Sequence, residues 1–157
     1  MIAASSRLRL LRWPLAIAAA VVVLDQLTKH WAVNALDDGD VIDLVGSLRF
    51  KLAFNTGMAF SRGEGIGPFV PILAITVVAL LLMAVGRSSS PWFTVGVGLI
   101  VGGTLGNVID RLFRGEGWFG GAVVDFVDVQ WWPVFNLADA AIVVGAGLLL
   151  LTSLRAP

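Results

Sequence analysis

Two aspartates in the second half of the chain have the residue type and setting for acid–base hydrolysis. Asp125 lies in Ala122-Val-Val-Asp-Phe-Val127, and Asp139 closes Phe135-Asn-Leu-Ala-Asp139 and opens a strongly apolar run. An acid inside an apolar membrane helix is costly and marks a functional site. Two carboxylates that converge share one proton, the arrangement of aspartyl-type catalysis. We therefore treat Asp125 and Asp139 as the candidate catalytic pair.

A second acid accompanies a lysine near the N-terminus. Asp25 and Lys29 are four residues apart with the acid first, which places them on one helix face in the favourable order. One interpretation is a salt bridge that lets the end of a helix tolerate charge. The other is a support for the active site or for an adjacent sheet. Neither interpretation makes these two residues catalytic.

A glycine-rich stretch, Gly102-Gly-Thr-Leu-Gly-Asn-Val-Ile-Asp-Arg111, carries further polar candidates. Asn107 and Arg111 are spaced i, i+4, so they share a helix face and are suited to orienting a carboxylate or binding substrate. Asp110 and Arg111 are expected to form an ion pair at the membrane surface. We assign Asp110 a structural role rather than a catalytic one.

Two short motifs complete the set of candidate substrate-binding or supporting residues. In Asn55-Thr-Gly-Met-Ala-Phe60, Asn55 is either part of a turn or a donor to a substrate carbonyl, and Gly57 leaves room for a bound chain. Asn136 and Asp139 share a helix face, flanked by Phe135 and Ala138. A helix that starts at Pro133 would place Asp139 past its first turn, where the helix dipole explains a carboxylate poorly.

The composition is that of an integral membrane protein. Of the 157 residues 57% are hydrophobic and only 14% are charged, against roughly 25% charged in a soluble domain. The length suits one domain, residues 1–157. The absence of cysteine excludes thiol catalysis, cysteine metal sites and disulfides. With no tyrosine present, the carboxylates and the single histidine, His30, are the main acid–base groups.

The hydropathy pattern predicts an all-α membrane protein with four transmembrane helices and a small extracytoplasmic β-sheet. The sheet is expected between the first and second helices, in the segment 34–65, where Val41 to Val45 and Leu48 to Phe54 alternate with period two. The segment 114–133 is expected to be extracytoplasmic, with 114–132 a loop rich in glycine and tryptophan. The first apolar run could also be a secretory signal peptide, but it flows into polar residues at helical spacing without a cleavage site. The expected spans are about 13–33, 66–85, 92–113 and 134–154.

The arginines predict the orientation. With four spans both termini lie on one side, together with the turn 86–91, and that side holds arginines and no acid: Arg7, Arg9, Arg12, Arg87 and Arg155. The positive-inside rule places this side in the cytoplasm. At a rise of about 1.5 Å per helical residue, Asp25, Asn107 and Asp139 fall in the same outer layer of the bilayer. We expect one buried polar site that opens toward the extracytoplasmic face.

Taken together, the motifs that contain Asp25 and Lys29, Asn55-x-Gly-x-Ala-Phe60, Gly102 to Arg111, Val124-Asp-Phe126 and Phe135-Asn-x-Ala-Asp139 resemble lipoprotein signal peptidase, or signal peptidase II. The resemblance covers almost the whole chain. It implies a bacterial intramembrane aspartyl endopeptidase that removes signal peptides from diacylglyceryl-modified prolipoproteins, cutting before the lipidated cysteine. The residues it implies are catalytic Asp125 and Asp139, with the other positions of the family pattern at Asp25, Lys29, Asn55, Asn107, Arg111 and Asn136.

The resemblance also implies the setting of the protein. It predicts a multi-pass protein of the bacterial cytoplasmic (inner) membrane, a monomer with no metal, no cofactor and no nucleic-acid partner. One departure from the family pattern is the stretch 115–121, which is longer than expected. It is either a flap over the site or a tolerated insertion.

Two other function classes remain open from the residues alone. A small transporter or channel could use Asp25, Asp110 and Asp139 as a proton or cation relay. It would depend on a membrane gradient, and the chain shows no internal repeat of the kind many transporters have. A lipid phosphotransferase could bind Mg²⁺ through the aspartates and would be inhibited by EDTA.

Overall fold

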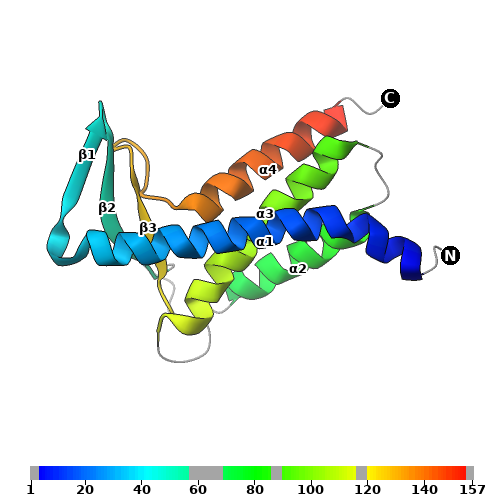
Figure 1. Ribbon diagram of the computed structural model, residues 1–157, viewed down its shortest axis with the longest axis horizontal. Coiled ribbons are helices and arrows are strands. Elements are labelled where there is room, and N and C mark those ends of the chain that lie inside the picture. Colours follow the sequence, from blue (N-terminus) through cyan, green and yellow to red (C-terminus); the bar gives the residue numbers. More distant parts are fainter. Residues whose placement is uncertain (1–3, 57–68, 86–89, 116–119, 155–157) are drawn as a thin grey trace.

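The computed structural model describes residues 4–56, 69–85, 90–115 and 120–154. The described residues form four helices and a three-stranded sheet. The helices run side by side, and the sheet lies at one end of them (Figure 1). The start of the first helix and the end of the last lie at the opposite end. In chain order the elements are α1 (Ala4–Ala35), a short 3₁₀ turn η1 (Asp37–Gly39), β1 (Val41–Val45), β2 (Leu48–Asn55), α2 (Phe69–Ala84), α3 (Pro91–Phe113), β3 (Val123–Asp128) and α4 (Leu137–Leu154).

Three of the four predicted spans coincide with helices that are long and apolar enough to cross a membrane. They are Arg9–Ala35, Pro91–Phe113 and Leu137–Leu154. The second predicted span, 66–85, begins outside the described residues, and its described part holds only a shorter apolar helix, Ile72–Ala84. The chain is therefore a mostly helical membrane protein with three clear span candidates.

Helix α3 lies against both α1 and α4 because glycine removes side chains from its contact faces. A β-carbon on Gly102 would lie 2.7 Å from Cβ of Val21 on α1. A β-carbon on Gly103 would collide with the carbonyl oxygen of Ala138 on α4. Such close approach of backbones is typical of small residues between membrane helices. It brings the polar ends of α1, α3 and α4 together.

The sheet is antiparallel in the order β1-β2-β3, and the predicted β1–β2 hairpin is confirmed. The prediction of a loop over the whole of 114–132 is wrong, because 123–128 forms β3 and pairs with β2. Nearly every β3 residue is buried, so the strand lacks the alternation of polar and apolar residues that reveals a half-exposed strand. The pairing places Asp125 opposite Ala53.

Helix α4 begins later than predicted, at Leu137 rather than near residue 134. Phe135 is held in an extended conformation, because its N–H donates to Val127 O at 3.0 Å and its carbonyl accepts from Val127 N at 2.8 Å. Asp139 therefore lies in the first turn of α4, not past it. The depth estimated for Asp139 by counting helical residues from Pro133 is wrong for the same reason.

Aromatic packing fixes the sheet on the end of α1. The ring of Trp31 meets Phe50 edge-on at 5.3 Å between centroids, and Phe50 lies 6.0 Å from Phe126 of β3. Ala32 and Leu36 are buried in the same cluster. The strand that carries Asp125 is thus anchored to the helix that carries Asp25 and Lys29.

Candidate functional site

Asn136 joins the two candidate aspartates. It precedes α4, its Oδ1 accepts from Asp139 N at 2.9 Å, and its own N–H donates to Asp139 Oδ2 at 3.2 Å. This reciprocal arrangement has the form of a capping box and explains why the helix starts here. With Oδ1 engaged, Nδ2 faces away from α4 and donates to Asp125 Oδ1 at 2.7 Å. One residue therefore contacts both Asp125 and Asp139.

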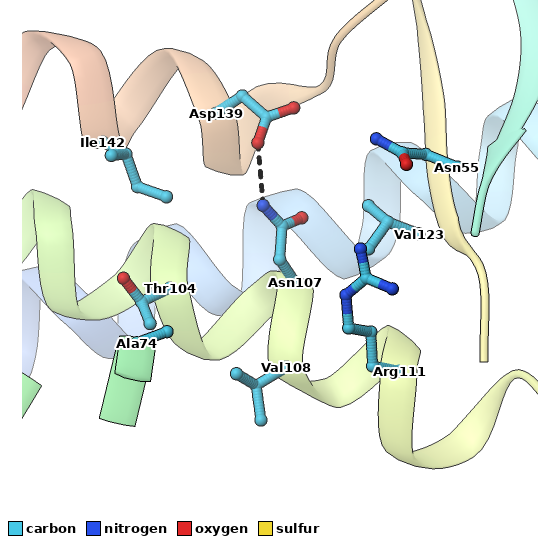
Figure 2. Close-up of a pocket in the computed structure, with 9 residues that line it drawn as sticks. All are labelled: Asn55, Ala74, Thr104, Asn107, Val108, Arg111, Val123, Asp139 and Ile142. Atoms are coloured by element: carbon cyan, nitrogen blue, oxygen red, sulfur yellow. Dashed lines mark hydrogen bonds between the residues drawn. The ribbon is translucent and has the colours of Figure 1, made fainter. Parts of the chain in front are cut away.

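Asn107 on α3 supplies the other contact to Asp139. Its Nδ2 donates to Asp139 Oδ1 at 2.8 Å, the contact drawn as a dashed line in Figure 2. Its Oδ1 accepts from Lys29 Nζ at 2.9 Å and from Asn136 Nδ2 at 3.1 Å. The two oxygens of Asp139 both act as acceptors, as in an ionised carboxylate.

Asp125 on β3 has a different electrostatic environment. Its side chain is buried, and the residue is 3% exposed. Burial, followed by the negative charge of Asp139, raises the pKa of Asp125 to about 6, against an opposing effect of hydrogen bonds from Asn55 and Asn136. The raised pKa favours the protonated form of Asp125.

A cluster of buried charges lies beside this pair, and we call Asp25, Lys29 and Asp110 the charge cluster. Lys29 Nζ lies 2.8 Å from Asp25 Oδ2 and 2.8 Å from Asp110 Oδ2, and all three side chains are fully buried. The predicted Asp25–Lys29 pair is therefore present. The predicted surface pair of Asp110 with Arg111 is wrong, since Asp110 is buried and its second cation is Arg114 at 2.8 Å. Arg114 follows at i+4, on the same helix face as Asp110.

A pocket opens beside Asp139. It has a volume of about 220 Å³ and receives residues from β2, β3 and three helices: Asn55, Ala74, Thr104, Asn107, Val108, Arg111, Val123, Asp139 and Ile142. Figure 2 shows Asn107 turned toward Asp139, with Arg111 and Asn55 beside it. We call this the polar pocket. Its groups combine hydrogen-bond donors for a peptide backbone with one carboxylate that can act on water.

A second hollow, which we call the apolar groove, also reaches Asp139. It measures about 480 Å³ and is lined mainly by apolar side chains: Val129, Trp131, Trp132, Phe135, Asp139, Ala140, Val143 and Val144. Its tryptophans are exposed. Asp139 therefore lines both the polar pocket and the apolar groove.

A family model described as Signal peptidase (SPase) II matches residues 17–155. The chain belongs to the signal peptidase II family. Its relatives include the lipoprotein signal peptidase of Mycobacterium avium, 44% identical over 149 residues that cover 94% of this chain and 80% of the relative. The lipoprotein signal peptidase of Mycobacterium tuberculosis is 42% identical over 147 residues, 93% of this chain and 73% of the relative.

Two solved structures of bacterial membrane enzymes have the same fold. One, at 1.9 Å resolution, matches with a TM-score of 0.80 and 27% identity over 92% of this chain and 94% of its own. The other, at 2.3 Å, matches with a TM-score of 0.77 and 28% identity over 90% and 87%. As a signal peptidase II, the protein is a protease, and its span helices place it in a membrane.

Three further predicted site residues of this signal peptidase II are Ala138, Phe135 and Gly57. Ala138 is buried, and its N–H donates to Asp25 Oδ1 at 3.0 Å. Phe135 contributes its backbone to β3 and its side chain to the apolar groove. Gly57 and the middle of the 115–121 stretch lie outside the described residues.

Two residues of the site, Gln26 and Arg114, were missed from the sequence. Gln26 donates to Asp110 Oδ1 at 3.1 Å and to Gly106 O at 3.2 Å. The i, i+4 spacing of Asp110 and Arg114 could have predicted their contact, whereas nothing in the residue pattern predicts the contacts of Gln26. Among the described residues, no group of three or more His, Cys, Asp or Glu is arranged to hold a metal ion.

Proposed function

We propose that this protein is an intramembrane aspartyl endopeptidase that removes signal peptides from diacylglyceryl-modified prolipoproteins, cutting before the lipidated cysteine. Asp125 and Asp139 are its catalytic pair. The observation that carries the proposal is the shared environment of these carboxylates. Asn136 hydrogen-bonds both, and the charge of Asp139 raises the pKa of Asp125. Two carboxylates so coupled hold one proton between them.

We propose different roles for the two carboxylates. Asp139 lines the polar pocket and its negative charge raises the pKa of Asp125, so in this proposal Asp139 is the base and Asp125 the acid. It takes a proton from water as the water oxygen attacks the scissile carbonyl carbon, and Asp125 donates its proton to the carbonyl oxygen. When the C–N bond breaks, the amine takes the proton held by Asp139, and a hydroxyl of the intermediate returns its proton to Asp125. The pair ends in its starting state without a covalent intermediate.

The pocket residues bind the peptide in this proposal. Asn55 and Arg111 line the polar pocket and are suited to donating to backbone carbonyls of the substrate. The signal peptide enters from the bilayer, along the apolar faces of the helices. The protein acts as a monomer and uses no metal or cofactor.

The proposed topology has four spans, including 66–85, within one protease domain of residues 1–157. The start of α1 and the end of α4 share one end of the molecule, and the sheet lies at the other (Figure 1). The arginines near the start of α1 and the end of α4 favour a cytoplasmic location for the end of the molecule that these helix ends share. The candidate site then faces the extracytoplasmic side of the bacterial cytoplasmic membrane.

The ion-relay alternative loses its support in this arrangement. Asp25 and Asp110 are both bound to Lys29 at 2.8 Å, so neither carboxylate is free to carry a passing cation. Membership in a protease family argues against the phosphotransferase alternative.

The test uses purified protein in detergent and two synthetic prolipoprotein peptides, identical except for a diacylglyceryl group on the cysteine. We expect cleavage of the lipidated peptide before its cysteine, identified by product mass and unchanged by EDTA. The unmodified peptide serves as the matched control and is expected to be cleaved far more slowly. Inhibition by EDTA, or a product cut elsewhere, would contradict the proposal.

A further inference from the structure

The residue before each proposed catalytic aspartate is held by the charge cluster. Val124 N, which precedes Asp125, donates to Asp110 Oδ2 at 3.2 Å. Ala138 N, which precedes Asp139, donates to Asp25 Oδ1 at 3.0 Å. Two separate carboxylates thus reach from α1 and α3 to equivalent backbone positions on β3 and α4.

Lys29 connects these two contacts and adds a third. An ammonium group has three N–H donors, and Lys29 Nζ has three acceptors: Asp25 Oδ2, Asp110 Oδ2 and Asn107 Oδ1. The contact with Asn107 fixes which end of that amide faces Asp139. Asn136 cannot fix it alone, because its two amide hydrogens serve three acceptors.

The charge cluster is packed so tightly that a displacement of one of its side chains moves the groups in contact with it. All three of its side chains are fully buried. Gly106 on α3 lies directly against it, and a β-carbon there would come 2.5 Å from Asp25 Oδ2. Gln26 and Arg114 hold the other oxygen of Asp110. Close-packed interiors of this kind pass a displacement on rather than absorb it.

From these contacts we propose that Asp25, Lys29 and Asp110 are positioning residues that set the separation and orientation of the two catalytic carboxylates. The cluster acts on the peptide units at Val124 and Ala138 and on the amide of Asn107. A role in stability alone would require only that the charges neutralise one another. The inference rests on the proposed function, since it assumes that Asp125 and Asp139 perform the chemistry.

The first test is Gly106→Ala, which removes no polar group but displaces the carboxylate of Asp25. Misplacement of catalytic groups by about 1 Å can cost about 100-fold in rate, so we expect kcat to fall by about that factor while KM changes less than about twofold. Gly147→Ala is the matched control, because a β-carbon at that α4 position meets nothing within 4 Å. It is expected to keep the wild-type kcat. A folded Gly106→Ala protein with wild-type kcat would overturn the proposal.

A second variant tests the same claim without changing the backbone. Lys29→Met combined with Asp110→Asn removes one positive and one negative charge, together with the contact to Asn107. We expect a fall in kcat of about 100-fold with KM nearly unchanged. The matched control is Arg49→Gln with Asp128→Asn, which removes the salt bridge on the sheet and is expected to keep kcat.

These experiments distinguish a failure of the positioning role from a failure of the proposed function. If both cluster variants unfold while their controls stay folded, the cluster serves stability, and the positioning role is wrong. If Asp125→Asn or Asp139→Asn still cleaves, the proposed function fails, whatever the cluster variants do. A loss of kcat in the cluster variants alongside inactive Asp125→Asn and Asp139→Asn proteins supports both claims.

Discussion

Four aspartates meet at the junction of helices and sheet, and they form two pairs with opposite surroundings; Asp25, Asp110 and Asp125 are buried and Asp139 is half-buried. Asp25 and Asp110 share the ammonium of Lys29 at 2.8 Å each. Within the described part of the chain, Asp125 and Asp139 instead accept hydrogen bonds from side-chain amides and a peptide N–H, principally those of Asn107 and Asn136. The side chains are alike, and the burial is comparable for Asp25, Asp110 and Asp125. The cation is what differs.

That difference accounts for the two proposed roles. A carboxylate paired with a buried cation stays charged and fixed, because breaking the pair leaves an uncompensated charge. Two carboxylates without such a cation repel each other, and one of them keeps a proton at a higher pH. The first arrangement is suited to holding structure in place. The second is suited to taking a proton from water and giving one to a carbonyl.

Removing the cation should abolish the contrast between the pairs. Lys29→Met leaves Asp25 and Asp110 buried without their common partner, so we expect the free energy of unfolding to fall by about 3–5 kcal/mol. Chemical unfolding in detergent measures the change. Leu27→Met on the exposed face of α1 is the control and should change stability by less than about 0.5 kcal/mol. Equal stabilities would mean that Lys29 does not compensate the two acids.

Neutralising Asp125 should stabilise the protein at neutral pH. Its pKa is raised from 3.8 to about 6 in the folded state, so the folded state binds more protons than the unfolded chain between these values. Stability is therefore lost as pH rises through this window. At pH 7.5 we expect Asp125→Asn to be more stable than wild type by about 1–3 kcal/mol.

The gain from Asp125→Asn should shrink as the pH is lowered toward 4. Thermal unfolding at a series of pH values measures it. A difference that does not vary with pH would show that the carboxyl of Asp125 titrates alike in the folded and unfolded states.

The pH dependence of catalysis should report the same proton. If Asp125 must be protonated, kcat/KM falls about tenfold per pH unit above the pKa of about 6 in the free enzyme. We expect the corresponding limb of kcat to lie at higher pH, because bound substrate removes more water from the site. Initial rates from pH 4.5 to 8.5 with the lipidated peptide provide both profiles. A flat kcat/KM across this range would exclude Asp125 as the acid.

The smallest expected effect concerns Gly147, a glycine of α4 outside the site. Gly147→Ala adds a methyl group where nothing lies within 4 Å, and alanine is favoured over glycine in a helix by about 0.8–1 kcal/mol. We expect a stability gain of up to that size. Gly106→Ala should gain less or lose, because its β-carbon displaces Asp25. Thermal unfolding measures the stability of both variants. Equal gains in stability would mean that the charge cluster accommodates the added β-carbon at no cost in free energy.

The sequence was informative where one local rule decides the structure. The alternating residues of β1 and β2 and the i, i+4 spacing of Asp25 and Lys29 each depend on a single element, and both predictions are confirmed. Strand β3 was missed because it is buried on both faces and has no polar alternation.

The start of α4 and the partners of Asp110 depend on contacts between distant segments. Phe135 is kept out of the helix by pairing with Val127, and Asn136 then becomes the cap. Asp110 takes its first cation from Lys29, more than eighty residues earlier in the chain. No spacing rule reveals such partners, because they exist only once α1, α3, β3 and α4 are assembled.

The most direct test of the account replaces each of the four aspartates with asparagine and measures kcat for the lipidated peptide per folded molecule. We predict that Asp125→Asn and Asp139→Asn fold and lose at least about 1,000-fold in kcat, since each removes a group that transfers a proton. Asp25→Asn and Asp110→Asn should retain measurable cleavage, because neither touches the reacting atoms. Cleavage by Asp125→Asn or Asp139→Asn at more than about a tenth of the wild-type rate would contradict the account.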